Sequence, residues 1–229
     1  CESTPTPTSD TGTPAECGGL AATIAGTGGS DLIQGTNGPD VIAGLGGDDE
    51  IDGLDADDTI CGGDGDDTVA GGSGVDMLSG GAGDDGLFGQ VGADTIDGGD
   101  DNDVLAAGYR DAEANSLNGG GGDDLLVGQG GADILLGTLG DDAIYGGRNE
   151  DRIDGGQGSD AAYGSAQGDA LDGGPGHDRF YGGFGNDAVL GGSGDDVVDG
   201  DRGTDDVDGG SGTDVCLSGE TLTGCENGM

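Results

Sequence analysis

An aspartate recurs every nine residues along most of this 229-residue chain. From Gly26 the sequence contains twenty nine-residue units, and the sixth position of every unit is Asp. These residues are Asp31, Asp40, Asp49, Asp58, Asp67, Asp76, Asp85, Asp94, Asp103, Asp124, Asp133, Asp142, Asp151, Asp160, Asp169, Asp178, Asp187, Asp196, Asp205 and Asp214. Carboxylates at one phase of a short period predict rows of like charge, which repel unless a cation lies between them.

The overall charge points to the same requirement. The chain has 48 acidic residues against five arginines, and its formal net charge is -43. This imbalance opposes a compact state through self-repulsion, and it excludes nucleic-acid and anionic-membrane partners, which need basic patches. Composition alone favours disorder, because 60 residues are Gly and only 3% are aromatic. A solvated acidic tail would not keep an acid in phase over twenty units, so we expect order that depends on a cation.

The other positions of the unit indicate how the aspartates are held. Position one is Gly in all units, position four is Gly in sixteen, and position eight is always apolar. The exceptions at position four are Ala56, Asp101, Asn149 and Gln167. Gly at positions one and four is expected to allow a positive φ in a tight turn and to let carbonyl groups converge. The last three residues of each unit predict a short strand with one inward side chain.

This alternation of turn and strand predicts an all-β, right-handed parallel β-roll, a flattened solenoid with two units per coil. Each strand would stack about 4.8 Å from the strand one coil away, and the inward Ile, Leu and Val residues would form two facing ladders. Aspartates eighteen residues apart would then approach along two edges. Asp31, Asp49 and Asp67 begin one row, and Asp40 and Asp58 begin the other.

Calcium is the cation that suits such edges. It takes about six to eight oxygen ligands from carboxylates and carbonyls in a tolerant geometry, whereas magnesium needs a stricter octahedron. Zinc needs His or Cys ligands, and the single His177 cannot supply a set.

The units GGDGDDTVA, GGSGDDVVD and GGFGNDAVL match the pattern GGxGxDxUx. In this respect residues 26–217 resemble the repeats-in-toxin (haemolysin-type) calcium-binding nonapeptide proteins. The resemblance implies a parallel β-roll with calcium in the turns between successive coils and with the sixth-position aspartates as side-chain ligands. Counting two turns one coil apart as one site, and leaving out the two sites that touch the degenerate turn, gives about 17 ions as an upper value. Their charge would offset most of the net charge of -43, so we expect folding to require the ion. The departures at position four would alter the backbone ligands of those turns.

Residues 107–118 interrupt the repeat. We interpret them as a degenerate repeat with three extra residues, in which Leu117 fills the inward position and Asn115 stands where Asp belongs. The two arrays would then form one solenoid; the alternative is a hinge between two short rolls. Tyr109, Arg110 and Glu113 would lie on a protruding loop and form no site.

The ends of the chain differ from the repeats. Residues 1–16 are predicted to form a Pro/Thr/Ser-rich tether. The roll is predicted to span residues 17–217, with residues 17–25 as its N-terminal cap. Residues 218–229 are predicted to form a C-terminal cap. A chain that starts at Cys1 and continues into such a tether resembles a mature bacterial lipoprotein, which implies lipidation of Cys1. The alternative is an arbitrary boundary or an unpaired Cys1. No segment approaches the roughly 20 apolar residues of a membrane span.

If Cys1 is lipidated, four cysteines remain. In the predicted stack, Cys216 lies too far from Cys17 and Cys61 to bond with either. This leaves Cys17–Cys61 and Cys216–Cys225, and the segment DVCLSGETLTGCE resembles the C-terminal cap of secreted calcium-binding repeat proteins. Two disulfides would imply an oxidising compartment. Free thiols are the alternative.

No residues indicate catalysis. The chain has no Lys for a phosphate-binding loop, and His177 falls at an outward turn position. We therefore expect a non-enzymatic, extracytoplasmic calcium-binding protein, either a structural rod anchored on a bacterial surface or a released one. The first alternative is an accessory module of a secreted lipase, protease or epimerase. The second is a surface that binds glycans or ice. The sequence does not identify a protein or glycan partner for this calcium-binding protein.

Overall fold

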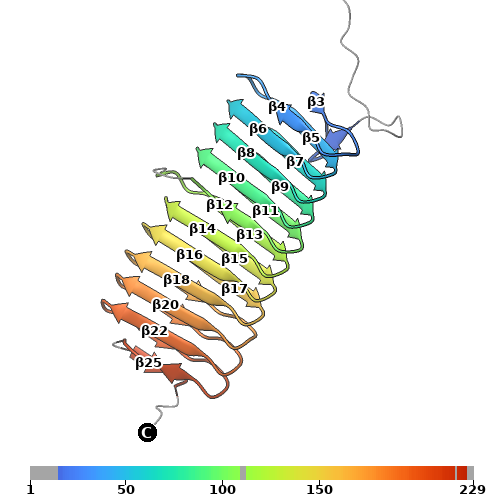
Figure 1. The fold of residues 1–229 in the computed structure, drawn as a ribbon. Helices are drawn as coiled ribbons and strands as arrows, with labels where there is room; N and C mark the ends of the chain where they lie inside the picture. The colour runs from blue at the N-terminus through green and yellow to red at the C-terminus, as the bar shows by residue number, and fades with distance from the viewer. Residues whose placement is uncertain (1–14, 109–111, 220, 226–229) are drawn as a thin grey trace, which may run out of the picture.

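The computed structural model describes residues 15–108, 112–219 and 221–225, which form a short antiparallel hairpin, β1–β2, followed by one long solenoid of parallel strands (Figure 1). All regular elements in these residues are strands, so the predicted all-β fold is confirmed. The strands of the first half are β1 Glu16–Cys17, β2 Leu20–Ala21, β3 Ile24–Ala25, β4 Leu32–Gln34, β5 Val41–Gly46, β6 Glu50–Asp55, β7 Thr59–Asp64, β8 Thr68–Ser73, β9 Met77–Ala82, β10 Gly86–Val91, β11 Thr95–Asp100 and β12 Val104–Ala106. Those of the second half are β13 Ser116–Gly121, β14 Leu125–Gly130, β15 Ile134–Leu139, β16 Ala143–Arg148, β17 Arg152–Gln157, β18 Ala161–Ala166, β19 Ala170–Asp172, β20 Arg179–Phe184, β21 Ala188–Leu190, β22 Val197–Arg202, β23 Asp206–Asp208, β24 Val215–Cys216 and β25 Thr221–Thr223.

The strands alternate between two sheets. The odd-numbered strands from β3 to β25 form a 12-stranded sheet, and the even-numbered strands from β4 to β24 form an 11-stranded sheet. Each strand therefore pairs in parallel with the strand two further along, as Ile51 of β6 does with Val69 of β8. Two nine-residue units make one coil, as the period predicts.

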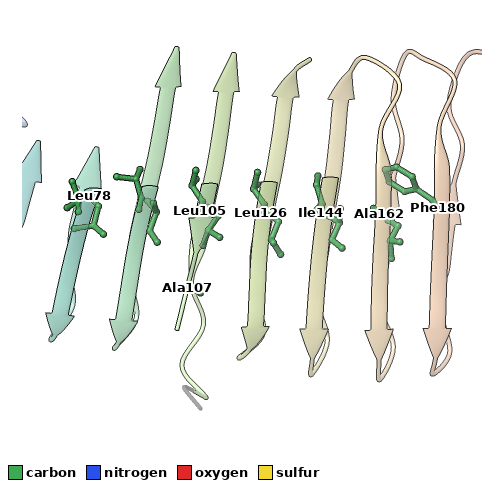
Figure 2. Packing of buried hydrophobic residues seen from close by; sticks show 14 of the residues in the cluster. Leu78, Leu105, Ala107, Leu126, Ile144, Ala162 and Phe180 are labelled. Atoms are coloured by element: carbon green, nitrogen blue, oxygen red, sulfur yellow. The ribbon is translucent and has the colours of Figure 1, made fainter. Parts of the chain in front are cut away.

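The core lies between the two sheets and is built from the eighth position of each unit. These side chains stack in register along the roll, and most of them are fully buried (Figure 2). Ala162 pairs with Phe180 on the neighbouring strand, and the Phe180 ring extends toward the space beside Ala162. A large side chain next to a small one keeps the thin core filled.

Most strands are longer than the three residues that the sequence predicts. β6, for example, continues from the end of one unit into the first three positions of the next, and its inward residues are Ile51 and Gly53. Position one of the unit is therefore an inward strand position. Because the residue at this inward position is Gly and has no side chain, the backbones of the two sheets can approach each other at the start of each turn.

The roll continues through the degenerate segment without a hinge. β11 pairs with β13, which aligns Ile96 with Leu117, and β12 pairs with both β10 and β14. Leu117 is fully buried in the core ladder, as predicted. Tyr109 and Arg110 lie outside the described residues, and Glu113 is exposed.

Disulfides close both ends of the described chain. Cys17–Cys61 joins the β1–β2 hairpin to β7, and Cys216–Cys225 joins β24 to the residues after β25. Cys1 and the first fourteen residues lie outside the described residues, so lipidation and the tether remain predictions. No helix among the described residues is long and apolar enough to cross a membrane.

Candidate functional site

The sixth-position aspartates line the two edges of the roll at the junction between turn and strand. All of them except Asp31 are buried, although each carries an ionisable group. The first row contains the aspartates on the same edge as Asp49, from Asp31 to Asp214. The second row contains the aspartates on the same edge as Asp58. Buried charges require partners, so the contacts of each carboxylate decide what these rows can do.

One oxygen of each carboxylate is used by the protein itself. The backbone N–H of Asp49 donates to Oδ1 of Asp67 at 2.8 Å, and that of Asp67 donates to Oδ1 of Asp85 at 2.7 Å. The second row has the same pattern, since Asp58 N–H donates to Asp76 Oδ1 at 2.9 Å. The structure therefore brings together the residues eighteen apart that the sequence predicts as neighbours.

The second carboxylate oxygen of these aspartates, Oδ2, lacks such a contact within the described chain in most turns. Along most of both rows Oδ2 is buried and accepts no hydrogen bond from the described part of the protein. These atoms belong to Asp49, Asp58, Asp67, Asp76, Asp85, Asp103, Asp124, Asp142, Asp151, Asp160, Asp169, Asp178, Asp187, Asp196 and Asp214. A buried anionic oxygen without a donor is costly, and a cation is the partner that removes the cost.

Glycine at position one leaves space for this oxygen. A Cβ on Gly155 would lie 2.6 Å from Asp160 Oδ2 and 2.9 Å from the carbonyl oxygen of Gly173, one coil further along. A carboxylate oxygen and a carbonyl oxygen thus face the same small space, which is the combination that calcium prefers. Position one has no left-handed φ, so our expectation for this glycine was wrong: it is needed for close approach.

The left-handed conformation occurs at positions two and four of the turn. Position two has a positive φ in eighteen of the twenty units, including Leu45 at 85° and Thr138 at 89°. Such a conformation costs a residue with a side chain about 1–3 kcal/mol, so it is kept for a structural or functional reason. We did not predict it, because position two is not reserved for glycine.

The residues that replace Gly at position four keep a positive φ. Ala56, Asp101, Asn149 and Gln167 have φ between 73° and 84°, whereas the glycines with a positive φ at this position range from 91° to 157°. The effect of these residues on the backbone ligands of their turns stays a prediction.

Burial makes these carboxylates hard to ionise without a cation. Burial, and to a smaller extent the negative charges of neighbouring acids, raises the pKa of Asp67 to about 6 and that of Asp151 and Asp169 to about 7. The hydrogen bond from the backbone of the preceding coil acts in the opposite direction. A divalent ion between the coils would reverse the largest of these effects, because it favours the charged carboxylate.

The donor set consists of oxygen atoms. The described residues contain no group of three or more His, Cys, Asp and Glu side chains that could hold a metal. The oxygen atoms that the structure places near one another are buried carboxylate oxygens and backbone carbonyls, such as those of Asp160 and Gly173. This set fits calcium and does not fit zinc.

The second row is interrupted at Asn115, as predicted. Asn115 occupies the place of an aspartate, and its Oδ1 accepts the backbone N–H of Asp94 at 2.8 Å. Its Nδ2 donates to Asp133 Oδ1 at 3.2 Å and to the carbonyl of Glu113 at 3.1 Å. An amide therefore supplies donors at the place where other turns present a buried carboxylate oxygen.

The first turn on each edge also differs. Oδ2 of Asp31 accepts from Thr27, and Oδ2 of Asp40 accepts from Thr36. Both units have Thr directly after the first Gly, but Thr138 stands at the same position of a later unit and donates to Asn118 instead, so this residue type alone does not predict the difference.

A family model of the RTX calcium-binding nonapeptide repeat, four copies long, matches most of the chain. Its overlapping matches are residues 25–60, 52–87, 61–96, 79–108, 111–135, 127–162, 154–189, 163–198 and 181–216. No match was found among curated proteins.

Proposed function

Because the chain belongs to the RTX calcium-binding nonapeptide repeat family, we propose that it is an exported, non-catalytic protein whose solenoid folds when its turns bind calcium. The sixth-position aspartates are the side-chain ligands in this proposal. The observation that carries it is the series of buried Oδ2 atoms with no donor in the described protein. Each of them faces the space between two coils, where a calcium ion would complete its contacts.

Coupled folding follows from the thinness of the core. The inward ladder has one apolar side chain per nine residues, so little apolar surface is buried for each turn that must be ordered. The formal charge of -43 opposes compaction as well. The free energy of calcium binding therefore has to supply a large part of the free energy of folding.

Export is supported by the two disulfides. Cys17–Cys61 and Cys216–Cys225 have the Cα separations of ordinary disulfides, 5.6 Å in both cases. Stable disulfides form in oxidising compartments outside the cytoplasm. A lipid anchor at Cys1 would keep the rod on a bacterial surface, and this part of the proposal rests on the sequence alone.

A structural rod fits the exposed face better than a sugar-binding surface does. Tyr145, Tyr163 and Tyr181 stack in parallel along the even-numbered sheet, with ring centroids 5.4 and 4.8 Å apart. Both faces of the Tyr163 ring are therefore covered by its neighbours. A sugar ring packs on an open aromatic face, and the central ring of this stack offers only its edge.

The experiment is a comparison of the purified chain at neutral pH in calcium, in magnesium and in chelator. Far-UV circular dichroism and small-angle X-ray scattering should report a strand-rich rod in calcium and an expanded chain in the other two. Calorimetric titration of the calcium-free protein should show many ions bound per chain. A strand signal that is unchanged by the chelator would refute coupled folding.

A further inference from the structure

The two turns nearest the N-terminus differ from the rest in how the carboxylate is satisfied. Asp31 Oδ2 accepts hydrogen bonds from the backbone N–H of Thr27 at 2.7 Å and from its hydroxyl at 2.9 Å. Asp40 Oδ2 accepts from the N–H of Thr36 at 2.7 Å and from its hydroxyl at 2.8 Å. An oxygen that accepts two hydrogen bonds has both lone pairs occupied, so it has none to offer a metal.

The backbone of these turns differs independently. Thr27 and Thr36 stand at position two, where the eighteen other units have a positive φ, and neither of them has one. The glycines at position four of the same turns, Gly29 and Gly38, also lack the positive φ that nearly all later turns show there. The first two turns therefore have neither the free oxygen nor the backbone shape of the later ones.

Threonine alone does not produce this closure. Thr138 stands at the same position of a later unit, but its φ is 89° and its hydroxyl donates to Asn118 Oδ1 at 2.8 Å. Oδ2 of Asp142 in that turn stays buried without a donor from the described chain. The closure thus requires the threonine and the alternative backbone together.

We propose that the first coil of the roll, residues 26–43, is closed by threonine hydroxyls instead of calcium and forms a metal-independent end on which the calcium-bound coils assemble. This inference rests on the proposed function, because it assigns which turns bind the ion. The first calcium ligands would be Asp49 and Asp58, and the capacity would fall from about 17 ions to about 15.

Other contacts hold this end together without metal. The Thr23 hydroxyl lies 3.1 Å from Asp40 Oδ1 and 3.1 Å from the carbonyl oxygen of Val41, and its single proton can be donated to either acceptor. Cys17 and Cys61 link the N-terminal hairpin to β7, and Cys17 packs with Ala22 and Ala43 in a small apolar cluster of its own. The first coil therefore packs through Ala43 against a hairpin that is covalently linked to β7, and Oδ2 of both its aspartates is hydrogen-bonded.

The opposite end of the roll lacks this arrangement. Oδ2 of Asp214, the last aspartate of the first row, is buried and accepts nothing from the described residues. The turn of Asp214 also has the usual positive φ, at Gly210 and Gly212. Since Oδ2 of Asp214 needs a further partner and the Oδ2 atoms of Asp31 and Asp40 do not, assembly of the coils should proceed from the N-terminal end.

Hydrogen exchange measured by mass spectrometry on the oxidised full chain tests the order of assembly. In calcium-free buffer at neutral pH, peptides within residues 23–46 should exchange at least about tenfold more slowly than peptides within 60–216. Calcium should then slow exchange in 60–216. Equal exchange of both regions without calcium would overturn the inference, whereas absence of any calcium effect in 60–216 would overturn the proposed function instead.

Ion counting by native mass spectrometry provides a second test that does not require the calcium-free state. The double variant Thr27→Gly, Thr36→Gly restores the common GG start of the unit in both turns and removes the competing hydroxyls. It should bind up to two more calcium ions per chain than the original protein. The matched control Thr138→Gly should bind an unchanged number. An unchanged count in the double variant, or an equal gain in the control, would contradict the proposed closure.

Discussion

The backbone N–H of Asp49 donates to Oδ1 of Asp67 at 2.8 Å, so one carboxylate oxygen joins two coils before any metal is considered. The other oxygen of Asp67 is buried without a donor among the described residues. Each aspartate therefore has two separable roles, one in spacing the coils and one in holding a cation. Substitutions that keep one role and remove the other distinguish them.

Asp67→Asn should remove calcium ligands while keeping an oxygen that can accept the N–H of Asp49. We expect the loss of up to two ions, those shared with Asp49 and Asp85, and little change on the opposite edge. Asp67→Ala should lose the same ions and also about 1 kcal/mol or more from the missing hydrogen bond. Native mass spectrometry counts the ions, and thermal unfolding in calcium measures the difference in stability.

The control for this prediction is Asp66→Asn at the adjacent exposed position. Asp66 Oδ1 accepts the backbone N–H of Asp84 at 3.1 Å, but its carboxylate is open to solvent. The ion count should therefore stay the same in this variant. An equal loss of ions from both variants would show that total charge, and not the buried row, determines binding.

Protons should compete with calcium for the same oxygens. Burial raises the pKa of Asp67 to about 6 and that of Asp151 to about 7, above the ordinary value of 3.8. Because the folded form without metal binds protons more tightly than the unfolded chain, its stability should increase as pH falls from about 7 toward 4 and disappear above about 7.

Circular dichroism of the calcium-free chain between about pH 4 and pH 8 measures this effect. Strand signal without calcium should increase on acidification, and the calcium concentration that half-saturates the folded chain should rise by up to about tenfold per pH unit for each proton displaced. A calcium-free chain that stays unfolded at every pH would contradict the expected role of proton binding.

Asn115→Asp should make the degenerate turn more dependent on metal. The amide of Asn115 donates to Asp133 Oδ1 at 3.2 Å, and a carboxylate in its place would face that acid with like charge. We expect weaker folding at low calcium, with a midpoint moved to higher concentration, and no loss of ions at saturation. Asn102→Asp, at an exposed turn position, is the matched control and should leave the midpoint nearly unchanged. Equal shifts in both variants would indicate a general charge effect.

The two disulfides should stabilise the ends unequally. Their sequence separations are 44 residues for Cys17–Cys61 and 9 for Cys216–Cys225. By loop-closure entropy these correspond to about 4 and about 3 kcal/mol. The Cys17→Ser, Cys61→Ser variant should therefore unfold at a lower temperature in calcium than Cys216→Ser, Cys225→Ser, and the reverse order would contradict this account.

Much of this structure could be predicted from the repeat. A period of nine places Ile51 and Val69 in register on one inward ladder, and it places Asp49 beside Asp67 on one edge. These relations depend only on stacking geometry and on the inward–outward alternation of strands, which a strict period determines. The same reasoning gave both disulfide pairings, because cysteines far apart along a rigid stack cannot meet.

The conformation of individual turns could not be predicted in this way. Leu45 and Thr138 adopt a left-handed φ that their residue types disfavour, because the surrounding coils impose it. Thr27 and Thr138 occupy the same position of the unit and make different hydrogen bonds. Tertiary context therefore decides which carboxylates are satisfied by the protein, and the repeat pattern alone does not contain that information.

Ala162 and Phe180 test how far the thin core tolerates changes in volume. They are in register on adjacent strands, and the Phe180 ring extends toward the space beside Ala162 (Figure 2). Phe180→Ala should cost about 3–5 kcal/mol, and Ala162→Leu should cost about 1–3 kcal/mol through overpacking. The double variant Ala162→Leu, Phe180→Leu restores the usual ladder. It should be more stable than the sum of the effects of Ala162→Leu and Phe180→Leu, each measured alone, by at least about 1 kcal/mol. Chemical unfolding in saturating calcium measures all of these variants, and strict additivity would show that the two side chains do not share one space.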